Sequence, residues 1–160
     1  MLTVSQLLKN KATWNEGDFG SNRIERIQTI SKACTALDAA KLMNEHHVGS
    51  LIVIDGFGDM IGIITERDLL TRVIAEERNP ADTQVLSVMT NEVVSCSPET
   101  KLSEVRLLMR NERIRHIPVI DHTIGKGSIV GMISIGDLNA ANNADLSIEV
   151  KSMRAYITQG

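Results

Sequence analysis

Aromatic side chains are nearly absent from this sequence, which limits both its core and its ligands. Phenylalanine, tryptophan and tyrosine make up 2% of the 160 residues, whereas hydrophobic residues of all kinds make up 42%. The core must therefore be built from aliphatic side chains, methionine and alanine. Proteins that bind single-stranded nucleic acid stack bases on aromatic rings, and Trp14, Phe19, Phe57 and Tyr156 are too few and too scattered for that.

The chain also lacks an excess of positive charge and a long apolar run. Its formal net charge is −3, which disfavours a nucleic-acid partner because phosphate-binding surfaces are basic. No apolar stretch approaches the roughly 20 residues of a membrane-spanning helix. The N-terminus, Met1-Leu-Thr-Val-Ser-Gln, lacks the features of a signal peptide. We therefore expect a cytoplasmic protein with no membrane partner.

Cysteine is rare, and the common catalytic motifs are missing. Cys34 and Cys96 do not form a C-x-x-C pair, so we expect two buried thiols rather than a disulfide or a metal site. The sequence has no H-E-x-x-H, P-loop or G-x-S-x-G motif. His46 and His47 are adjacent and would diverge on a helix. We expect no enzyme, no catalytic cofactor and no metal.

One segment occurs twice in the chain. The stretch Ile27–Asp68 returns as Val93–Asp137, and both copies end in Gly-φ-φ-[Ser/Thr]-x-x-Asp, where φ is apolar. A repeat of this kind determines the architecture. Each copy spans only about 50–60 residues, which is marginal for an independent core. We therefore expect the two copies to share one core.

The hydrophobic pattern of each copy predicts the order strand, helix, strand, strand, helix. Ser50–Asp55 and Ile117–Asp121 are apolar runs typical of strands buried on both faces. The first strands are expected near Ile24–Ile30 and Val93–Cys96. Thr100 is the expected N-cap of the helix in the second copy. The helices in the middle of the copies carry the apolar residues Ala36, Ala39, Ala40, Leu42 and Met43, and Leu102, Val105, Leu108 and Met109.

These elements predict a mixed α/β (α+β) fold with four parts. Residues 1–23 form an N-terminal helix and an insertion, 24–84 the first unit, 85–144 the second unit, and 145–160 an amphipathic C-terminal helix. Short apolar helical segments are expected just ahead of both copies, and helices over Glu66–Glu77 and from Gly136 onward. The insertion Asn10–Arg23 has no counterpart in the second copy, so it is either a connector or a flap over a site.

The repeated motif places a hydroxyl and a carboxylate where a strand meets a helix. These pairs are Thr65 with Asp68 and Ser134 with Asp137. A helix N-terminus attracts anions, and a carboxylate can accept hydrogen bonds from the two hydroxyls of a ribose. Alternatively, each pair is a capping box that only stabilises its helix. The glycine permits close approach of either a flat ligand or packed backbone.

The two copies differ in charge beside this motif. Arg115 and His116 precede a strand of the second copy, where the first copy has Gly49 and Ser50. Arginine suits bidentate phosphate contact. We interpret Arg115 and His116 as candidate phosphate ligands, and Arg106, Arg110 and Arg113 as a solvated helix face.

At these residues the chain resembles the cystathionine-β-synthase (CBS) domain family, as a tandem pair called a Bateman module and of the small stand-alone bacterial kind. The matching motifs include Ser50-Leu-Ile-Val-Ile-Asp55, Gly62-Ile-Ile-Thr-Glu-Arg-Asp68 and Gly131-Met-Ile-Ser-Ile-Gly-Asp137. The resemblance implies two β-α-β-β-α units related by pseudo-two-fold symmetry. It also implies clefts between the units that bind adenosine-containing ligands such as AMP, ATP or NAD.

The resemblance also implies roles for single residues. Asp68 and Asp137 would hold ribose hydroxyls, Thr65 and Ser134 would contact ribose or phosphate, and Arg67, Arg115 and His116 would contact phosphate. Backbone that would read the adenine edge lies near Ile27, Thr29, Ser50, Leu51, Val93 and Ser95. The first copy departs from the pattern because Ile52 stands where the second has Pro118, and because it lacks the basic pair.

Two functions follow from these expectations. The first is a regulatory module, in which an adenosine ligand changes conformation and thereby biases a regulated protein. The alternative is a ligand-free dimeric scaffold for protein interactions, in which the repeated Asp residues are only caps. A homodimer is expected in both cases, because such small units bury more surface when copies pack together.

Overall fold

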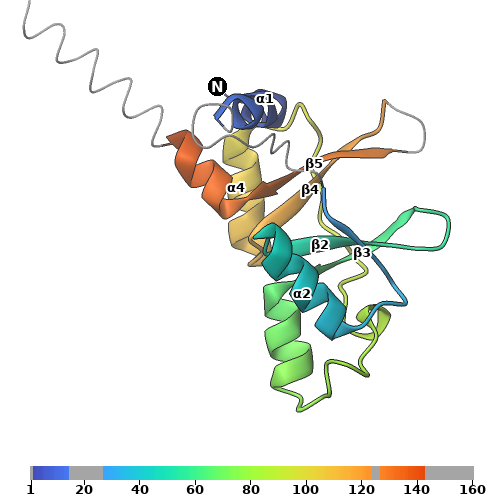
Figure 1. Ribbon diagram of the computed structural model, residues 1–160. Helices are drawn as coiled ribbons and strands as arrows, with labels where there is room; N and C mark the ends of the chain where they lie inside the picture. Colours follow the sequence, from blue (N-terminus) through green and yellow to red (C-terminus); the bar gives the residue numbers. More distant parts are fainter. Residues whose placement is uncertain (1, 15–26, 124–126, 143–160) are drawn as a thin grey trace, which may run out of the picture. The chain divides into compact units, whose positions relative to one another are not determined.

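The computed structural model describes residues 2–14, 27–123 and 127–142 and divides the chain into two compact units (Figure 1). One unit contains residues 25–94. The other combines residues 1–24 with residues 95–160. Both mix helices with a small sheet, which confirms the predicted α+β class. The predicted helix at 145–160 and most of the insertion Asn10–Arg23 lie outside the described residues.

The unit of residues 25–94 is a three-stranded sheet with helices packed on it. Strand β1 runs parallel to β2, and β2 runs antiparallel to β3. The helix that starts at Glu66 continues as one π-helical turn and ends at Ile74, short of the predicted Glu77. The elements are β1 (Thr29–Ser31), α2 (Ala36–His46), β2 (Ser50–Ile54), β3 (Met60–Thr65), α3 (Glu66–Asp68), the π-helix η1 (Leu69–Ile74) and the 3-10 helix η2 (Val85–Ser87).

The other unit repeats this plan with a two-stranded sheet. Its elements are α1 (Val4–Trp14), α4 (Leu102–Glu112), β4 (His116–Asp121), β5 (Ser128–Ser134) and a helix over residues 135–142. The strand predicted at Val93–Cys96 is wrong, because only Cys96 pairs, through a single parallel bridge to Val119. Pro98 follows closely and has no N–H to extend the ladder.

The start of α4 differs from the prediction. Lys101, not Thr100, is its N-cap and makes no side-chain cap. The Thr100 hydroxyl instead accepts the Ser97 N–H at 3.1 Å. The free N–H groups at the starts of α1 and α4 are bonded by backbone carbonyls of the segment just before the other helix. Val4 N–H donates to the Thr100 carbonyl at 2.9 Å, and Leu102 N–H donates to the Leu2 carbonyl at 3.1 Å. A distant segment thus replaces the local cap.

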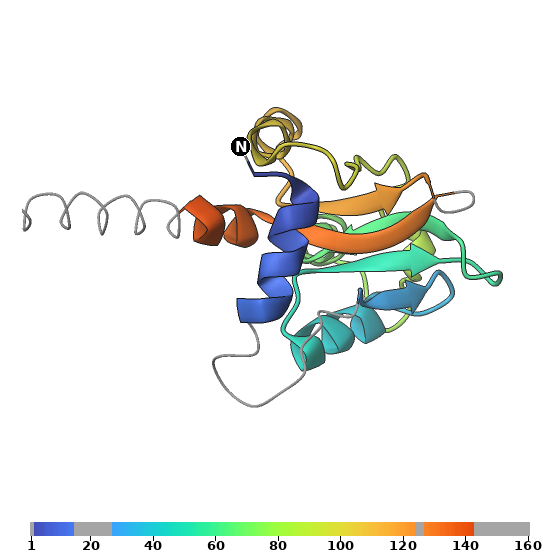
Figure 2. The ribbon, with the colours of Figure 1, turned by 90° about the horizontal axis from the view of Figure 1, so that it is seen from above.

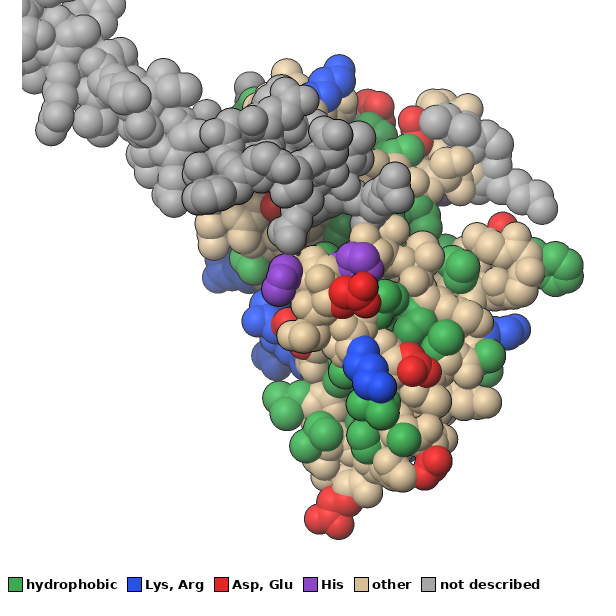
Figure 3. Space-filling model, viewed as in Figure 1, with side chains coloured by type: hydrophobic (Ala, Val, Ile, Leu, Met, Phe, Trp, Pro, Cys, Tyr) green, Lys and Arg blue, Asp and Glu red, His purple; other side chains and the backbone are tan. Residues whose placement is uncertain are grey.

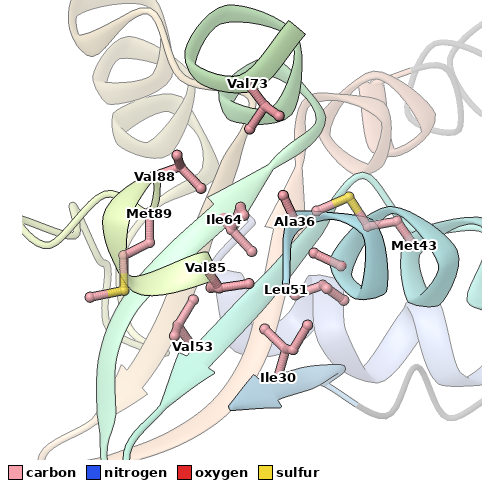
Figure 4. Close-up of a cluster of buried hydrophobic side chains, with 11 residues drawn as sticks. Ile30, Ala36, Met43, Leu51, Val53, Ile64, Val73, Val85, Val88 and Met89 are labelled. Atoms are coloured by element: carbon pink, nitrogen blue, oxygen red, sulfur yellow. The ribbon is translucent and has the colours of Figure 1, made fainter. Parts of the chain in front are cut away.

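The described residues include one buried hydrophobic cluster in each unit, and the expectation that the two copies share one core stays a prediction. In residues 25–94, Val85, Val88 and Met89 pack beside Val53 and Ile64 (Figure 4). In the other unit α1 crosses the β4–β5 hairpin (Figure 2) and buries Val4 and Leu7 with its core. Each repeat is therefore completed by the segment that precedes the other repeat in the chain. This exchange enlarges each core beyond one copy.

The repeated glycine makes room for these exchanged segments. A Cβ at Gly62 would lie 2.7 Å from the Thr90 carbonyl oxygen and 2.8 Å from the Met89 sulfur. A Cβ at Gly131 would lie 2.8 Å from a methyl of Leu8. Of the two reasons for glycine that the sequence left open, close packing of the protein itself therefore holds at both positions.

Both cysteines are free thiols that pack with the hydrophobic cores. Cys96 is buried, and burial raises the pKa of its thiol to about 11. Cys34 is only half-buried. The expectation of two buried thiols is thus confirmed for Cys96.

Candidate functional site

The repeated hydroxyl–carboxylate pairs have the same geometry in both units. The Asp68 carboxylate accepts the Thr65 hydroxyl at 2.8 Å and the Thr65 N–H at 2.9 Å. Asp137 accepts the Ser134 hydroxyl and N–H, both at 2.7 Å. In return each hydroxyl accepts the N–H of its aspartate, at 3.3 Å and 3.2 Å. Both motifs are therefore capping boxes, as one of the two interpretations required.

The caps use only one oxygen of each carboxylate. In both motifs the bonds to the cap residue go to Oδ2. A carboxylate has two oxygens and about four acceptor positions, so the cap leaves acceptor capacity on Oδ1. Around Asp68, Oδ1 lies 3.6 Å from Nε of Arg72, and the residue as a whole is only 8% exposed. Asp137 is half-buried. Capping and ligand binding are therefore compatible at the same residue.

Strand pairing brings the other predicted residues to these junctions. Ser50 lies directly opposite Thr65, and His116 lies directly opposite Ser134. The pairing extends one residue further, because Ile135 N–H donates to the Arg115 carbonyl at 2.9 Å. His116 is half-buried and Arg115 exposed. The second repeat therefore has a hydroxyl, a carboxylate, an imidazole and a guanidinium on adjoining residues.

The remaining predicted residues are less closely grouped. The side chain of Leu51 is fully buried in the core, so only its backbone can meet a ligand. Thr29 is exposed and pairs with Ile52. Ile27 precedes β1, and Arg67 is exposed on α3. Val93 and Ser95 fall on opposite sides of the boundary between the two units.

A hollow that the sequence did not reveal lies in the unit of residues 25–94. It has a volume of about 470 Å³ and opens beside the end of α2 and the start of α3. Its polar groups come from Asn44, His47 and Glu66, and Glu66 directly follows Thr65 of the Ser50–Thr65 pair. Residues from two helices line it, so no local motif could have indicated it. The full lining is Ala40, Met43, Asn44, His47, Val48, Gly49, Glu66 and Leu69.

Two aspartates outside these junctions, the exposed Asp38 and the half-buried Asp121, make similar local bonds. Asp38 forms a capping box with Thr35 at the start of α2, and the Thr35 backbone N–H, followed by its hydroxyl, lowers the Asp38 pKa. Asp121 accepts the hydroxyl and N–H of Thr123 in a turn, and these bonds lower its pKa. The pKa falls because hydrogen bonds to a carboxylate favour its ionised form. Since Asp38 and Asp121 accept the same kinds of local bonds as Asp68 and Asp137, they serve as matched comparisons for those two residues.

The surface of the described residues carries both signs of charge. Acidic and basic side chains are interspersed on the face seen in Figure 3. Among residues 2–14, 27–123 and 127–142, no helix has the length and apolar character to cross a membrane. The same residues contain no cluster of three or more His, Cys, Asp or Glu side chains suited to a metal ion.

Comparison with known proteins gives one consistent family. The model of the CBS domain matches residues 23–75 and 85–142. The mitochondrial CBS domain-containing protein CBSX3 of Arabidopsis thaliana is 41% identical over 162 residues, covering 99% of this chain and 73% of that protein. Since this relative is mitochondrial by name, the expected cytoplasmic location stays a prediction.

Solved structures agree with that match. A protein from Burkholderia ambifaria, described as a signal-transduction protein with CBS domains, has a TM-score of 0.76 and 38% identity, covering 90% of this chain and 96% of the other. A hexameric CBS-CP12 protein from bloom-forming cyanobacteria has a TM-score of 0.63 and 35% identity, covering 71% of this chain and 64% of the other.

Proposed function

Because the chain belongs to the CBS domain family and carries two such domains, we propose that it is a regulatory module that binds an adenosine-containing ligand such as AMP, ATP or NAD. CBS domains generally act as regulatory modules. Binding would stabilise one conformation over another and so bias a regulated protein. We propose no catalysis by this chain.

The observation that carries this proposal is the junction of β5 with the helix over residues 135–142. Ser134 and Asp137 offer a hydroxyl and a carboxylate, the donor and acceptor groups that suit ribose hydroxyls, and the cap bonds of Asp137 go to Oδ2. His116 lies opposite Ser134, and Arg115 adjoins it with a cation suited to phosphate. A sugar and its phosphate can thus be met by neighbouring residues of one unit.

The first repeat supports the same ligand class with weaker phosphate contacts. Thr65 and Asp68 repeat the hydroxyl and carboxylate, but Ser50 lies where the second repeat has His116. Arg67, exposed on α3, is the nearby cation proposed for phosphate. The backbone proposed to read the adenine edge remains that near Ile27, Thr29, Ser50, Leu51, Val93 and Ser95.

Added nucleotide is expected to raise the thermal stability of the protein. A ligand at a hundredfold excess over its dissociation constant adds about 2.7 kcal/mol to the unfolding free energy. Melting should be followed with AMP, ATP and NAD, with adenine-free ribose 5-phosphate as the control. Mass spectrometry of the purified protein should identify any ligand that accompanies it. If no adenosine compound shifts the melting temperature, the dimeric interaction scaffold becomes the better reading.

We also propose that the chain forms a homodimer. The hexameric CBS-CP12 neighbour supports self-association in proteins of this fold. Sedimentation equilibrium should give a mass near twice the 17.6 kDa of one chain. A mass of 17.6 kDa at micromolar concentration would contradict the dimer, whereas a larger multiple would favour a higher oligomer.

A further inference from the structure

Arg72 contacts two parts of its unit at once. On one side its Nε lies 3.6 Å from Oδ1 of Asp68, the oxygen that the cap does not use. On the other side its Nη1 donates to the carbonyls of Val88 and Met89 at 2.8 Å and 2.7 Å. The Arg72 side chain is 44% exposed, whereas that of Asp68 is 11% exposed. Asp68 is therefore tied through one guanidinium to the residues that follow η2.

Those residues are bound in turn to the edge strand of the sheet. Thr90 N–H donates to the Ile63 carbonyl at 2.8 Å, and Ile63 N–H donates to the Thr90 carbonyl at 3.0 Å. Met89 and Thr90 lie against Gly62, where no side chain keeps them away. Residues 88–94, which we call the connector, then lead the chain out of this unit towards the second repeat. The anchoring of the connector thus includes Arg72.

We propose that Arg72 couples the state of Asp68 to the connector. This inference rests on the proposed function, in which Asp68 takes ribose hydroxyls. A ribose on Oδ1 would compete with Arg72 for the same carboxylate oxygen. The guanidinium would then adjust its contacts with the carbonyls of Val88 and Met89, and the stability of the connector would change with occupancy.

The second repeat has no arginine at the position that corresponds to Arg72. Arg72 stands four residues after Asp68, and the residue four after Asp137 is Ala141, a small side chain buried in the core. The two junctions therefore differ in role. The first, with Arg72, transmits its occupancy to the chain between the repeats, and the second, with Arg115 and His116, is the one equipped for phosphate.

A double-mutant cycle in the ligand-free protein tests the coupling. Asp68→Asn retains a cap acceptor but removes the charge that faces Arg72, and Arg72→Met retains the stem but removes the guanidinium. Amide exchange of Thr90 reports opening of the connector. We expect D68N to speed this exchange about threefold or more, and to have no further effect once R72M is present. If D68N speeds Thr90 exchange by the same factor with and without R72M, the coupling is overturned.

Two controls separate coupling from loss of a helix cap. Asp38→Asn alters the equivalent capping box on α2 and should leave Thr90 exchange unchanged; an effect as large as that of D68N would overturn the inference. Arg72→Lys keeps the positive charge but removes the guanidinium that bonds the carbonyls of Val88 and Met89. It should also speed amide exchange of Thr90. This variant decides the matter if R72M does not fold.

Nucleotide provides a second readout that keeps the two proposals apart. AMP is titrated calorimetrically into the Asp137→Ala variant, in which the second junction is disabled. Its binding should change Thr90 exchange, and Arg72→Met should abolish that change. Binding without a change at Thr90 would overturn the coupling and leave the proposed function intact. Absence of any binding by the wild type would overturn the proposed function, while the ligand-free cycle still decides the link from Asp68 to the connector.

Discussion

Replacing Asp137 by alanine is expected to weaken adenine-nucleotide binding about 10-fold to 100-fold. The carboxylate would accept charge-assisted hydrogen bonds from ribose, and one such bond contributes about 1.5–3 kcal/mol. The affinity for AMP, ATP and NAD should be measured by isothermal titration calorimetry on wild type and variant. The second repeat should dominate this loss, since Arg115 and His116 adjoin its junction.

The control must separate loss of ligand contact from loss of the cap. Asp121→Ala removes a carboxylate of the same unit that accepts the hydroxyl and N–H of Thr123, as Asp137 accepts those of Ser134. It should leave nucleotide affinity unchanged. If D137A binds all three compounds as tightly as wild type, Asp137 is only a helix cap and its assignment to ribose is wrong.

Replacing Gly62 by alanine is expected to lower the unfolding free energy by about 1–3 kcal/mol, the usual cost of overpacking. The new methyl would meet the Thr90 carbonyl oxygen at 2.7 Å and the Met89 sulfur at 2.8 Å. Backbone cannot move aside without breaking the two hydrogen bonds between Thr90 and Ile63. Urea denaturation followed by circular dichroism measures the loss, and the melting temperature should fall by several degrees.

Two other glycines serve as controls for this prediction. A methyl at Gly131 would meet only the side-chain end of Leu8, which can turn away, so Gly131→Ala should cost less than Gly62→Ala. Gly56→Ala places its methyl in open space and should change stability little. Equal stability of all three variants would show that the connector does not pack on Gly62 as described.

Much of the fold and part of the site could be predicted because their signals are local. The apolar runs of β2 and β4 and the stripe of α4, in which Val105 and Met109 are buried, lie where the sequence placed them. The repeated motif predicted both junctions, including the capping geometry at Asp68 and Asp137. The Thr35–Asp38 box was missed, although its Thr-x-x-Asp spacing was readable.

Two of the errors share a cause, since each involves a segment whose partner is distant in the chain. Thr100 resembles an N-cap, but the start of α1 satisfies the first turn of α4 through backbone. The run Val93–Cys96 resembles a strand, but only Cys96 finds a partner in β4. Arg72 shows nothing unusual in sequence, because the carbonyls that it binds belong to residues 88 and 89.

The sequence by itself determined the duplication, the class of fold, the family and the hydroxyl–carboxylate pair at each junction, because periodicity and motif spacing are written in consecutive residues. Only the tertiary structure decided which segment completes which unit. The helix α1 packs with the second repeat and the segment after Val85 with the first. A copy of this size does not bury enough apolar surface alone, and the choice of its partner depends on packing at Gly62 and Gly131 that no local pattern encodes.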